Sequence, residues 1–251
     1  MTNVTFSISR LAGATNRLQF LLVHSDAGKK EQFASTVAHL AASNHAVVAF
    51  DRRGHGQSSM PTDGRFGYSV ESGDVFDVAD IVGYERFVLI GHSGGGDVAF
   101  KAANERPERI AGLLLIDPGP DPMVIPADQK KAMLDGLHAD FAASIGKYYR
   151  GIAGPDPLIA DEIVATALAT PPASIIGITE YLDEFRPREF ANSFRGPAHA
   201  VIQPQFDVDG ALHRLHTEMT HEGIADAGHW IHMVAPEQFA AALDRFLERV
   251  R

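Results

Sequence analysis

Short apolar runs alternate along the chain with longer segments in which hydrophobic residues recur every three or four positions. Several of the short runs are apolar throughout, which is typical of strands buried on both faces of a parallel sheet. They predict β-strands over residues 4–9, 18–24, 46–50, 87–91, 112–116, 198–203 and 217–224. The longer segments predict helices over residues 30–42, 70–82, 95–104 and 236–249. This alternation predicts a doubly wound, mostly parallel α/β sheet.

One long stretch interrupts the alternation. Between residues 121 and 195 no strand pattern is present, and helical periodicity recurs over residues 128–144, 158–169 and 174–185. We therefore expect a helical cap, residues 121–195, inserted into a core formed by residues 1–120 and 196–251. The alternative is that these helices only cover one face of the sheet. A cap at the ends of the strands would control the access of water and substrate.

Composition and charge narrow the classes of partner. The chain has 251 residues, a formal net charge of −10 and no basic run, which argues against nucleic acid and against an anionic membrane surface. A small, neutral or hydrophobic substrate is the expected ligand. There is no cysteine, so disulfides, thiolate metal sites and a cysteine nucleophile are excluded. The start of the chain lacks a basic segment followed by a long apolar run, and we expect a soluble, cytoplasmic protein.

A serine between glycines is the first candidate for chemistry. The sequence Gly91-His92-Ser93-Gly94-Gly95 directly follows the apolar run at 87–90 and precedes a predicted helix. In a Gly-x-Ser-x-Gly elbow, a tight strand-to-helix turn exposes the serine hydroxyl, and helix amides face the developing oxyanion. The pattern also occurs by chance, so the rest of the chain has to support it.

Four separate motifs together resemble those of the α/β-hydrolase superfamily, in the branch with a serine nucleophile and a helical cap. They occur in the order in which that superfamily has them. The motifs are Leu21-Leu22-Val23-His24, Asp51-Arg52-Arg53-Gly54-His55-Gly56-Gln57-Ser58, the elbow at Ser93, and Gly228-His229-Trp230 with the helix that begins near Pro236. The resemblance implies an α/β-hydrolase sheet, a catalytic triad and an oxyanion hole, and it covers nearly the full length apart from the cap.

The resemblance assigns the triad in the order nucleophile, acid and base. Ser93 is the nucleophile and His229 is the base that takes its proton. Asp207 follows the predicted strand at 198–203, where relatives usually carry the acid, and is the expected partner of His229. Asp117, at the end of the preceding core strand, and Asp209 are the alternatives. Four other histidines, His24, His55, His92 and His232, are interpreted as structural or pocket-lining residues.

The oxyanion hole departs from the pattern of the superfamily. The amide of Gly94 is one expected donor, and the amide of Ser25, in the loop after His24, is the other. Relatives usually have glycine after this histidine, whereas this chain has Ser25 followed by Asp26. We expect the Asp26 side chain to face solvent, because a carboxylate that pointed inward would repel an oxyanion.

These residues predict a cofactor-independent serine hydrolase that cleaves an ester or a related carbonyl compound through an acyl-enzyme. A carbon-carbon bond hydrolase, a lactonase or a perhydrolase could use the same triad, and a non-catalytic ligand-binding protein on this fold is the alternative of another class. Ser93 stands where dehalogenases and epoxide hydrolases of the superfamily have aspartate. No phosphate-loop, dinucleotide or metal-ligand spacing is present, so neither a cofactor nor a metal is indicated. The sequence does not indicate an oligomeric state.

Overall fold

The computed structural model describes residues 4–14 and 17–250. Residues 1–3, at the start of the chain discussed above, lie outside the described residues. It contains a seven-stranded sheet in the order β1-β3-β2-β4-β5-β6-β7. β1 is antiparallel to β3, and every other neighbouring pair is parallel. This confirms the predicted mostly parallel α/β sheet. The strands are β1 (Ile8–Leu11), β2 (Gln19–Val23), β3 (Ala46–Phe50), β4 (Phe87–His92), β5 (Ile110–Ile116), β6 (Ala198–Ile202) and β7 (Thr220–Gly223).

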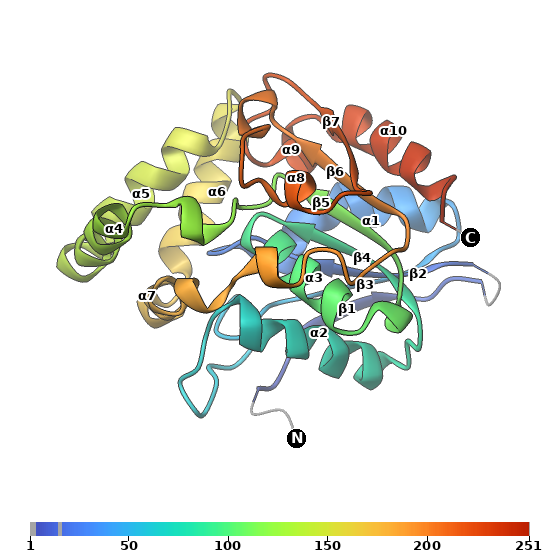
Figure 1. Ribbon diagram of the computed structural model, residues 1–251, viewed down its shortest axis with the longest axis horizontal. Helices are drawn as coiled ribbons and strands as arrows, with labels where there is room; N and C mark the ends of the chain where they lie inside the picture. The colour runs from blue at the N-terminus through green and yellow to red at the C-terminus, as the bar shows by residue number, and fades with distance from the viewer. Residues whose placement is uncertain (1–3, 15–16, 251) are drawn as a thin grey trace.

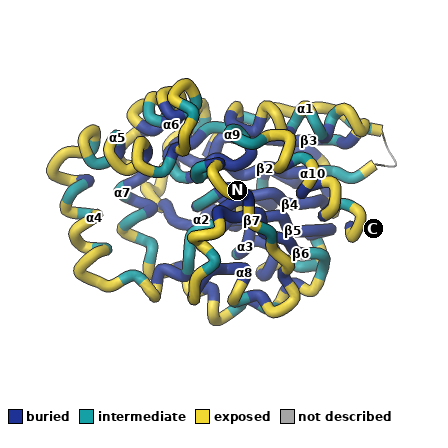
Figure 2. Tube along the Cα trace, turned by 90° about the horizontal axis from the view of Figure 1, so that it is seen from above, coloured by how far each residue is buried: buried dark blue, intermediate teal, exposed yellow. Residues whose placement is uncertain are grey.

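Helices cover both faces of the sheet, and the side-chain alternation along the strands explains why. In β2, Phe20 and Leu22 pack on the side of helices α1 (Ala34–Ala42) and α10 (Pro236–Leu247). Leu21 belongs to the core on the opposite side, with α2 (Tyr68–Val82) and α3 (Gly94–Glu105). Because successive strand residues point to opposite faces, an apolar strand builds two cores at once. Figures 1 and 2 show this layering, with the strands buried in the centre and the outer faces of the helices exposed.

The segment between β5 and β6 is helical, as the sequence predicts, and its helices gather at one end of the molecule (Figure 1). They are α4 (Ala127–Ala139), α5 (Phe141–Ile152), α6 (Pro157–Ala169) and α7 (Pro172–Glu180). The predicted helix over 128–144 is two helices, because Asp140 leaves the helical conformation and its side chain accepts a hydrogen bond from the Ala143 amide at the start of α5.

Two short helices lie in the connections that follow the last two strands. They are α8 (Leu212–Leu215) and α9 (Ile231–Val234), which follow β6 and β7 respectively. The predicted helix over 30–42 begins with a 3-10 turn, η1 (Lys30–Phe33), and continues as α1. No single helix in the described part of the chain has the length and apolar composition of a membrane span. Helices α6 and α7 have this length and composition only when they are taken together, and the pair is bent by 84°.

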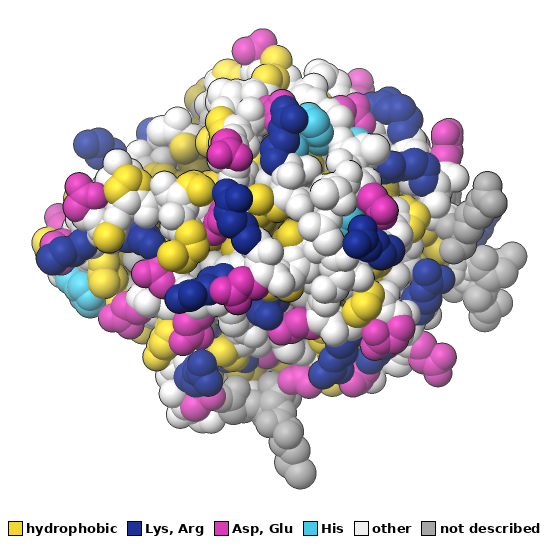
Figure 3. Space-filling model, in the orientation of Figure 1, with side chains coloured by type: hydrophobic (Ala, Val, Ile, Leu, Met, Phe, Trp, Pro, Cys, Tyr) yellow, Lys and Arg dark blue, Asp and Glu magenta, His cyan; other side chains and the backbone are white. Residues whose placement is uncertain are grey.

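The surface has no strong charge bias on the face that Figure 3 shows. Acidic and basic side chains alternate there, with small apolar groups between them. No patch of a single charge sign is therefore visible on this face.

Candidate active site

Ser93 lies at a sharp turn between β4 and α3. Its backbone has φ 53° and ψ −127°, a conformation that costs energy for any residue with a side chain. The neighbouring glycines make the turn possible. A Cβ atom on Gly91 would lie 2.3 Å from the Gly95 carbonyl oxygen, and one on Gly95 would lie 2.2 Å from that of His24. The elbow geometry that the sequence predicts is therefore present.

His229 lies in the loop between β7 and α9, and the loop is held beside the elbow. The His229 amide donates to the carbonyl oxygen of Ile152 at the end of α5 (2.8 Å), and its own carbonyl accepts a hydrogen bond from His92 Nε2 (2.9 Å). His92 directly precedes Ser93, and its ring centroid is 4.9 Å from that of His229. The histidine loop thus contacts both the elbow strand and the cap.

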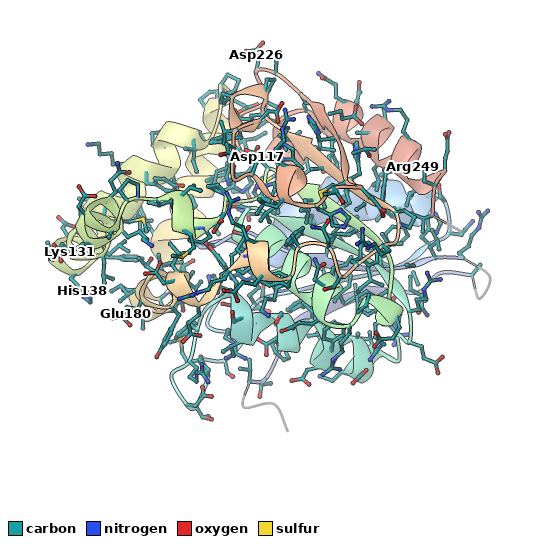
Figure 4. All side chains as sticks on the ribbon, viewed as in Figure 1. Asp117, Lys131, His138, Glu180, Asp226 and Arg249 are labelled. Atoms are coloured by element: carbon teal, nitrogen blue, oxygen red, sulfur yellow. The ribbon has the colours of Figure 1, made fainter. Side chains whose placement is uncertain are left out.

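The carboxylate that contacts His229 is Asp117, at the end of β5. Its Oδ2 atom is 2.7 Å from His229 Nδ1. Gln203 donates to Asp117 from its amide (2.9 Å) and from its Nε2 atom (3.1 Å). Asp117 is 1% exposed, has φ 42°, and lies in the interior between the cap and the sheet (Figure 4). A carboxylate that accepts from Nδ1 leaves Nε2 of the imidazole for proton transfer.

The prediction that Asp207 is the partner of His229 is wrong. Both oxygen atoms of Asp207 accept hydrogen bonds from Arg214, at 2.6 Å each, and Oδ1 lies 2.9 Å from His213 Nε2. These hydrogen bonds, that from Arg214 first, lower the pKa of Asp207. The 3-10 turn η6 (Pro204–Phe206) after β6 directs Asp207 toward α8 rather than toward the histidine loop. Asp209 is exposed, and the described contacts do not connect it with His229.

Asp26, rather than Ser25, faces the elbow from the loop after β2. A Cβ atom on Gly94 would lie 2.2 Å from Asp26 Oδ1, so the carboxylate rests against the backbone of Gly94. The Ser25 side chain is buried instead, and its hydroxyl has no hydrogen-bond partner among the described residues. The expectation that Asp26 faces solvent is therefore wrong: its side chain is only 23% exposed.

Two groups hold the Asp26 carboxylate in this position. Arg52 Nη1 donates to Oδ1 and the Tyr68 hydroxyl donates to Oδ2, each at 2.7 Å. Arg52 also donates from Nε to Glu71 (2.7 Å) and is 1% exposed. Burial alone would lower the pKa of Arg52, but the charges of Glu71 and Asp26 outweigh burial and raise it. The Asp26 charge is thus paired with a permanently charged guanidinium.

A cavity of about 330 Å³ lies between Ser93 and the cap. Ser93, Gly94 and Asp26 line one side, and side chains from α4, α5 and α7 line the other. The cap side is mostly apolar: Met133, Leu137, Ile145, Tyr148, Tyr149, Ile175 and Ile178. The arrangement places the Ser93 turn at the floor of a largely apolar cavity, as expected of a ligand site.

Asp97 and Tyr68 also line this cavity, and neither residue was predicted from the sequence. Asp97 lies in the first turn of α3 and is 3% exposed. Burial, with the nearby Asp26 charge, raises its pKa well above the usual value for an aspartate. Asp97 lies in the first turn of a helix that packs against the sheet. Carboxylates are rarely buried without a partner, and an aspartate at such a position is the signal in the sequence that could have identified it.

The four histidines interpreted as structural are all buried. His24 Nδ1 lies 2.8 Å from the Ser25 carbonyl oxygen, and its Nε2 accepts from the Arg52 amide (2.9 Å). His55 bridges the same two loops, because its Nε2 accepts from the Ala27 amide (3.3 Å). Burial lowers the pKa of His24, His55, His92 and His232, the last to about 3. Neutral imidazoles therefore support the oxyanion loop and the elbow.

Comparison with known proteins identifies the fold family of the chain. A sequence model of the α/β hydrolase fold matches residues 20–150. The bifunctional esterase/perhydrolase of Acinetobacter calcoaceticus is 35% identical over 115 residues, which are 43% of this chain and 41% of that protein. The chain thus spans about two fifths of the length of such curated relatives, and their activities do not transfer from the match alone.

Solved structures resemble the whole chain. An esterase from Thermogutta terrifontis has a TM-score of 0.85 at 21% identity, covering 98% of this chain and 94% of that one. The enol-lactonase of Burkholderia xenovorans LB400 has a TM-score of 0.83 at 19% identity, with coverages of 98% and 97%. Because the sequence identities are this low, the similarity shows only that the folds are alike. Taken with the match over residues 20–150, it shows that the chain belongs to the α/β-hydrolase fold family of enzymes.

Proposed function

We propose that this enzyme is a serine hydrolase that cleaves a small carboxylic ester, with Ser93 as nucleophile, His229 as base and Asp117 as the acid of the triad. The observation that carries the proposal is the 2.7 Å contact between His229 Nδ1 and Asp117, made beside the elbow that presents Ser93 to the cavity. A buried carboxylate on Nδ1 selects the tautomer whose Nε2 can accept a proton.

In the first step the Ser93 oxygen attacks the ester carbonyl while His229 Nε2 takes the hydroxyl proton. The tetrahedral intermediate collapses, His229 returns the proton to the departing alkoxide, and an alcohol leaves. A water molecule then attacks the acyl-enzyme, again with His229 as base, and releases the carboxylic acid and free Ser93. Asp117 stabilises the imidazolium that forms in both steps, without itself taking the proton.

The amides of Gly94 and Asp26 are our candidates for the oxyanion hole. The Gly94 amide begins α3, where helix amides have no intrahelical acceptor and the helix dipole favours negative charge. The Asp26 amide has no acceptor among the hydrogen bonds of the described residues. The nearby Asp26 carboxylate opposes an oxyanion, but its hydrogen bonds from Arg52 and Tyr68 reduce this effect.

We further propose that residues 121–195 act as the cap of this site. Apolar side chains from α4, α5 and α7 form the cavity wall that faces Ser93, so they limit both the size of the substrate and the access of water. Lactonase, perhydrolase and carbon-carbon hydrolase chemistry would use the same three residues.

A panel of p-nitrophenyl esters with acyl chains of increasing length tests the proposal. We expect turnover of the short chains, and loss of nearly all turnover in the Ser93→Ala variant, since the nucleophile is absent. Correct folding of the variant is checked by its far-ultraviolet circular dichroism and its melting temperature. Turnover retained in Ser93→Ala, or no labelling of Ser93 by a fluorophosphonate in the folded wild type, would contradict the proposal.

A further inference from the structure

The carboxyl group of Asp97 lines the cavity and is buried. It is 3% exposed, and its Oδ1 atom has no partner among the described residues. A Cβ atom on Gly119, another lining residue, would lie 2.7 Å from Asp97 Oδ2, so the carboxyl group packs against the Gly119 backbone and only a glycine fits there. A buried, unpartnered polar group costs free energy unless a ligand supplies the missing bond.

Asp97 lies close to the reacting serine. It follows Ser93 by one helical turn, and its amide donates to the Ser93 carbonyl oxygen at 3.1 Å. Ser93 and Asp97 also line the same cavity. A group bound at Asp97 would therefore share this cavity with a carbonyl positioned at Ser93.

The ionisable groups of the cavity wall are acidic or phenolic. Among the described residues, the wall contains two aspartates and three tyrosines and no lysine, arginine or histidine: Asp26, Asp97, Tyr68, Tyr148 and Tyr149. The nearest guanidinium, that of Arg52, is already shared by Asp26 and Glu71. A substrate carboxylate would meet no free cation in this cavity, whereas a cation would meet carboxylates and aromatic faces.

We propose that the cavity binds substrates that carry a protonated amine, and that Asp97 accepts the hydrogen bond of this ammonium group. The ammonium would supply the donor that Asp97 lacks, and the tyrosine rings would add cation–π attraction. This replaces the expectation of a neutral or hydrophobic substrate. The catalytic part of the inference, that such compounds are cleaved, rests on the proposed hydrolase function, whereas the binding part does not.

Binding is tested first, without catalysis. Hexylammonium, 1-hexanol and hexanoate are titrated into the wild type and into Ser93→Ala by calorimetry. The fluorescence of Trp230, the only tryptophan of the chain, gives a second readout, since its ring lies 5.7 Å from that of the cavity residue Tyr149. We expect both proteins to bind hexylammonium about tenfold more tightly than either other compound, as a desolvated ion pair implies.

Two variants identify the residue responsible. Asp97→Asn keeps the shape but removes the charge, and we expect it to lose most of the preference for hexylammonium. Asp128→Asn removes one carboxylate from an exposed position of α4 and should keep the preference. Equal or tighter binding of 1-hexanol or hexanoate by the wild type, or an unchanged preference in Asp97→Asn, would overturn the inference.

A matched pair of thioesters then connects binding with turnover. S-[2-(dimethylamino)ethyl] thiobutyrate and S-(3-methylbutyl) thiobutyrate have the same shape and differ in the ammonium group. A thiol reagent detects the released thiol without background, because the chain has no cysteine. We expect a higher kcat/KM for the amine, by about tenfold, and loss of this difference in Asp97→Asn.

The outcomes separate the two proposals. Binding of hexylammonium without cleavage of either thioester, and without labelling of Ser93, would support the ammonium site and reject the hydrolase. Cleavage of the neutral thioester at the same rate as the amine, with no preference in binding, would leave the hydrolase standing and reject the ammonium site.

Discussion

The Nδ1 atom of His229 lies 2.7 Å from Oδ2 of Asp117, although the two residues are 112 positions apart in the chain. Asp117 ends β5, the strand next to β4, which ends at the elbow of Ser93. The contact therefore brings together the ends of two adjacent parallel strands and the histidine loop, where open α/β sheets bind their ligands.

The acid of the triad is tested by a pair of isosteric variants. Asp117→Asn should lower kcat by about ten-thousand-fold, because an amide no longer selects the tautomer that His229 needs. Asp207→Asn should stay close to the wild type, because the Asp207 carboxylate pairs with Arg214 at the surface. Steady-state kinetics with one ester measure kcat for both variants. A larger loss of kcat in Asp207→Asn than in Asp117→Asn would show that Asp207 is the acid of the triad.

The contact between two glycines controls the position of the histidine loop. A Cβ atom on Gly228 would lie 2.3 Å from Gly154 Cα, and Gly228 has φ +62°. Gly228→Ala should therefore displace His229 and reduce kcat/KM by about tenfold or more. Gly151→Ala is the matched control, since a Cβ atom there meets nothing within 4 Å, and helix α5 should tolerate or favour it. Equal activity of both variants would contradict this account of the loop.

The Arg52 guanidinium stabilises the fold as well as the site. It is 1% exposed between Asp26 and Glu71, so Arg52→Met leaves the buried Glu71 carboxylate and the half-buried Asp26 carboxylate without their cation. We expect the free energy of unfolding to fall by about 3–5 kcal/mol. Lys131→Met, which removes an exposed pair with Asp135 on α4, should cost less than about 0.5 kcal/mol. Urea unfolding of both variants measures the difference, and similar losses would refute the buried-pair interpretation.

The carboxyl group of Asp97 should make stability depend on pH. Burial raises its pKa in the folded state above the unfolded value, so the folded protein holds this proton more tightly. Its destabilising effect is then absent below the unfolded pKa and fully present above the folded one. Asp97→Asn should therefore have a higher free energy of unfolding in urea than the wild type at pH 8.

The difference between Asp97→Asn and the wild type should vanish as the pH falls toward about 4, the unfolded pKa of aspartate. The groups that face Asp97 and set its pKa are Asp26 and Arg52. Asp128→Asn, whose side chain is exposed, should show no such pH trend. A constant difference between Asp97→Asn and the wild type from pH 4 to pH 8 would argue against a buried, unpaired carboxyl group.

The periodicity of the sequence was sufficient to predict the fold. Apolar runs such as Ala46–Phe50 mark strands whose two faces are both buried, and this property is local to the sequence. The elbow and the Gly228-His229 loop could also be predicted, since tight backbone turns require glycines at fixed positions. The ends of the helices could not be predicted as well from the sequence. The break at Asp140 shows this, because a single side-chain cap determines where α5 begins.

The acid and the oxyanion loop could not be predicted in the same way. Asp117 and Asp207 both follow core strands, and only the path of η6 and the pairing of Asp207 with Arg214 separate them. The inward position of Asp26 depends on Arg52 and Tyr68, which are 26 and 42 residues away. Contacts of this kind depend on tertiary packing, which a single sequence does not reveal.

The most direct test of the central claim is covalent labelling of Ser93. The wild type, Asp117→Asn, Asp207→Asn and Ser93→Ala are treated with a fluorophosphonate, and the labelled peptide is identified by mass spectrometry. We expect rapid labelling of Ser93 in the wild type and in Asp207→Asn, much slower labelling in Asp117→Asn, and none at this position in Ser93→Ala. Labelling of another residue in the wild type, or equal rates in Asp117→Asn and the wild type, would contradict this claim.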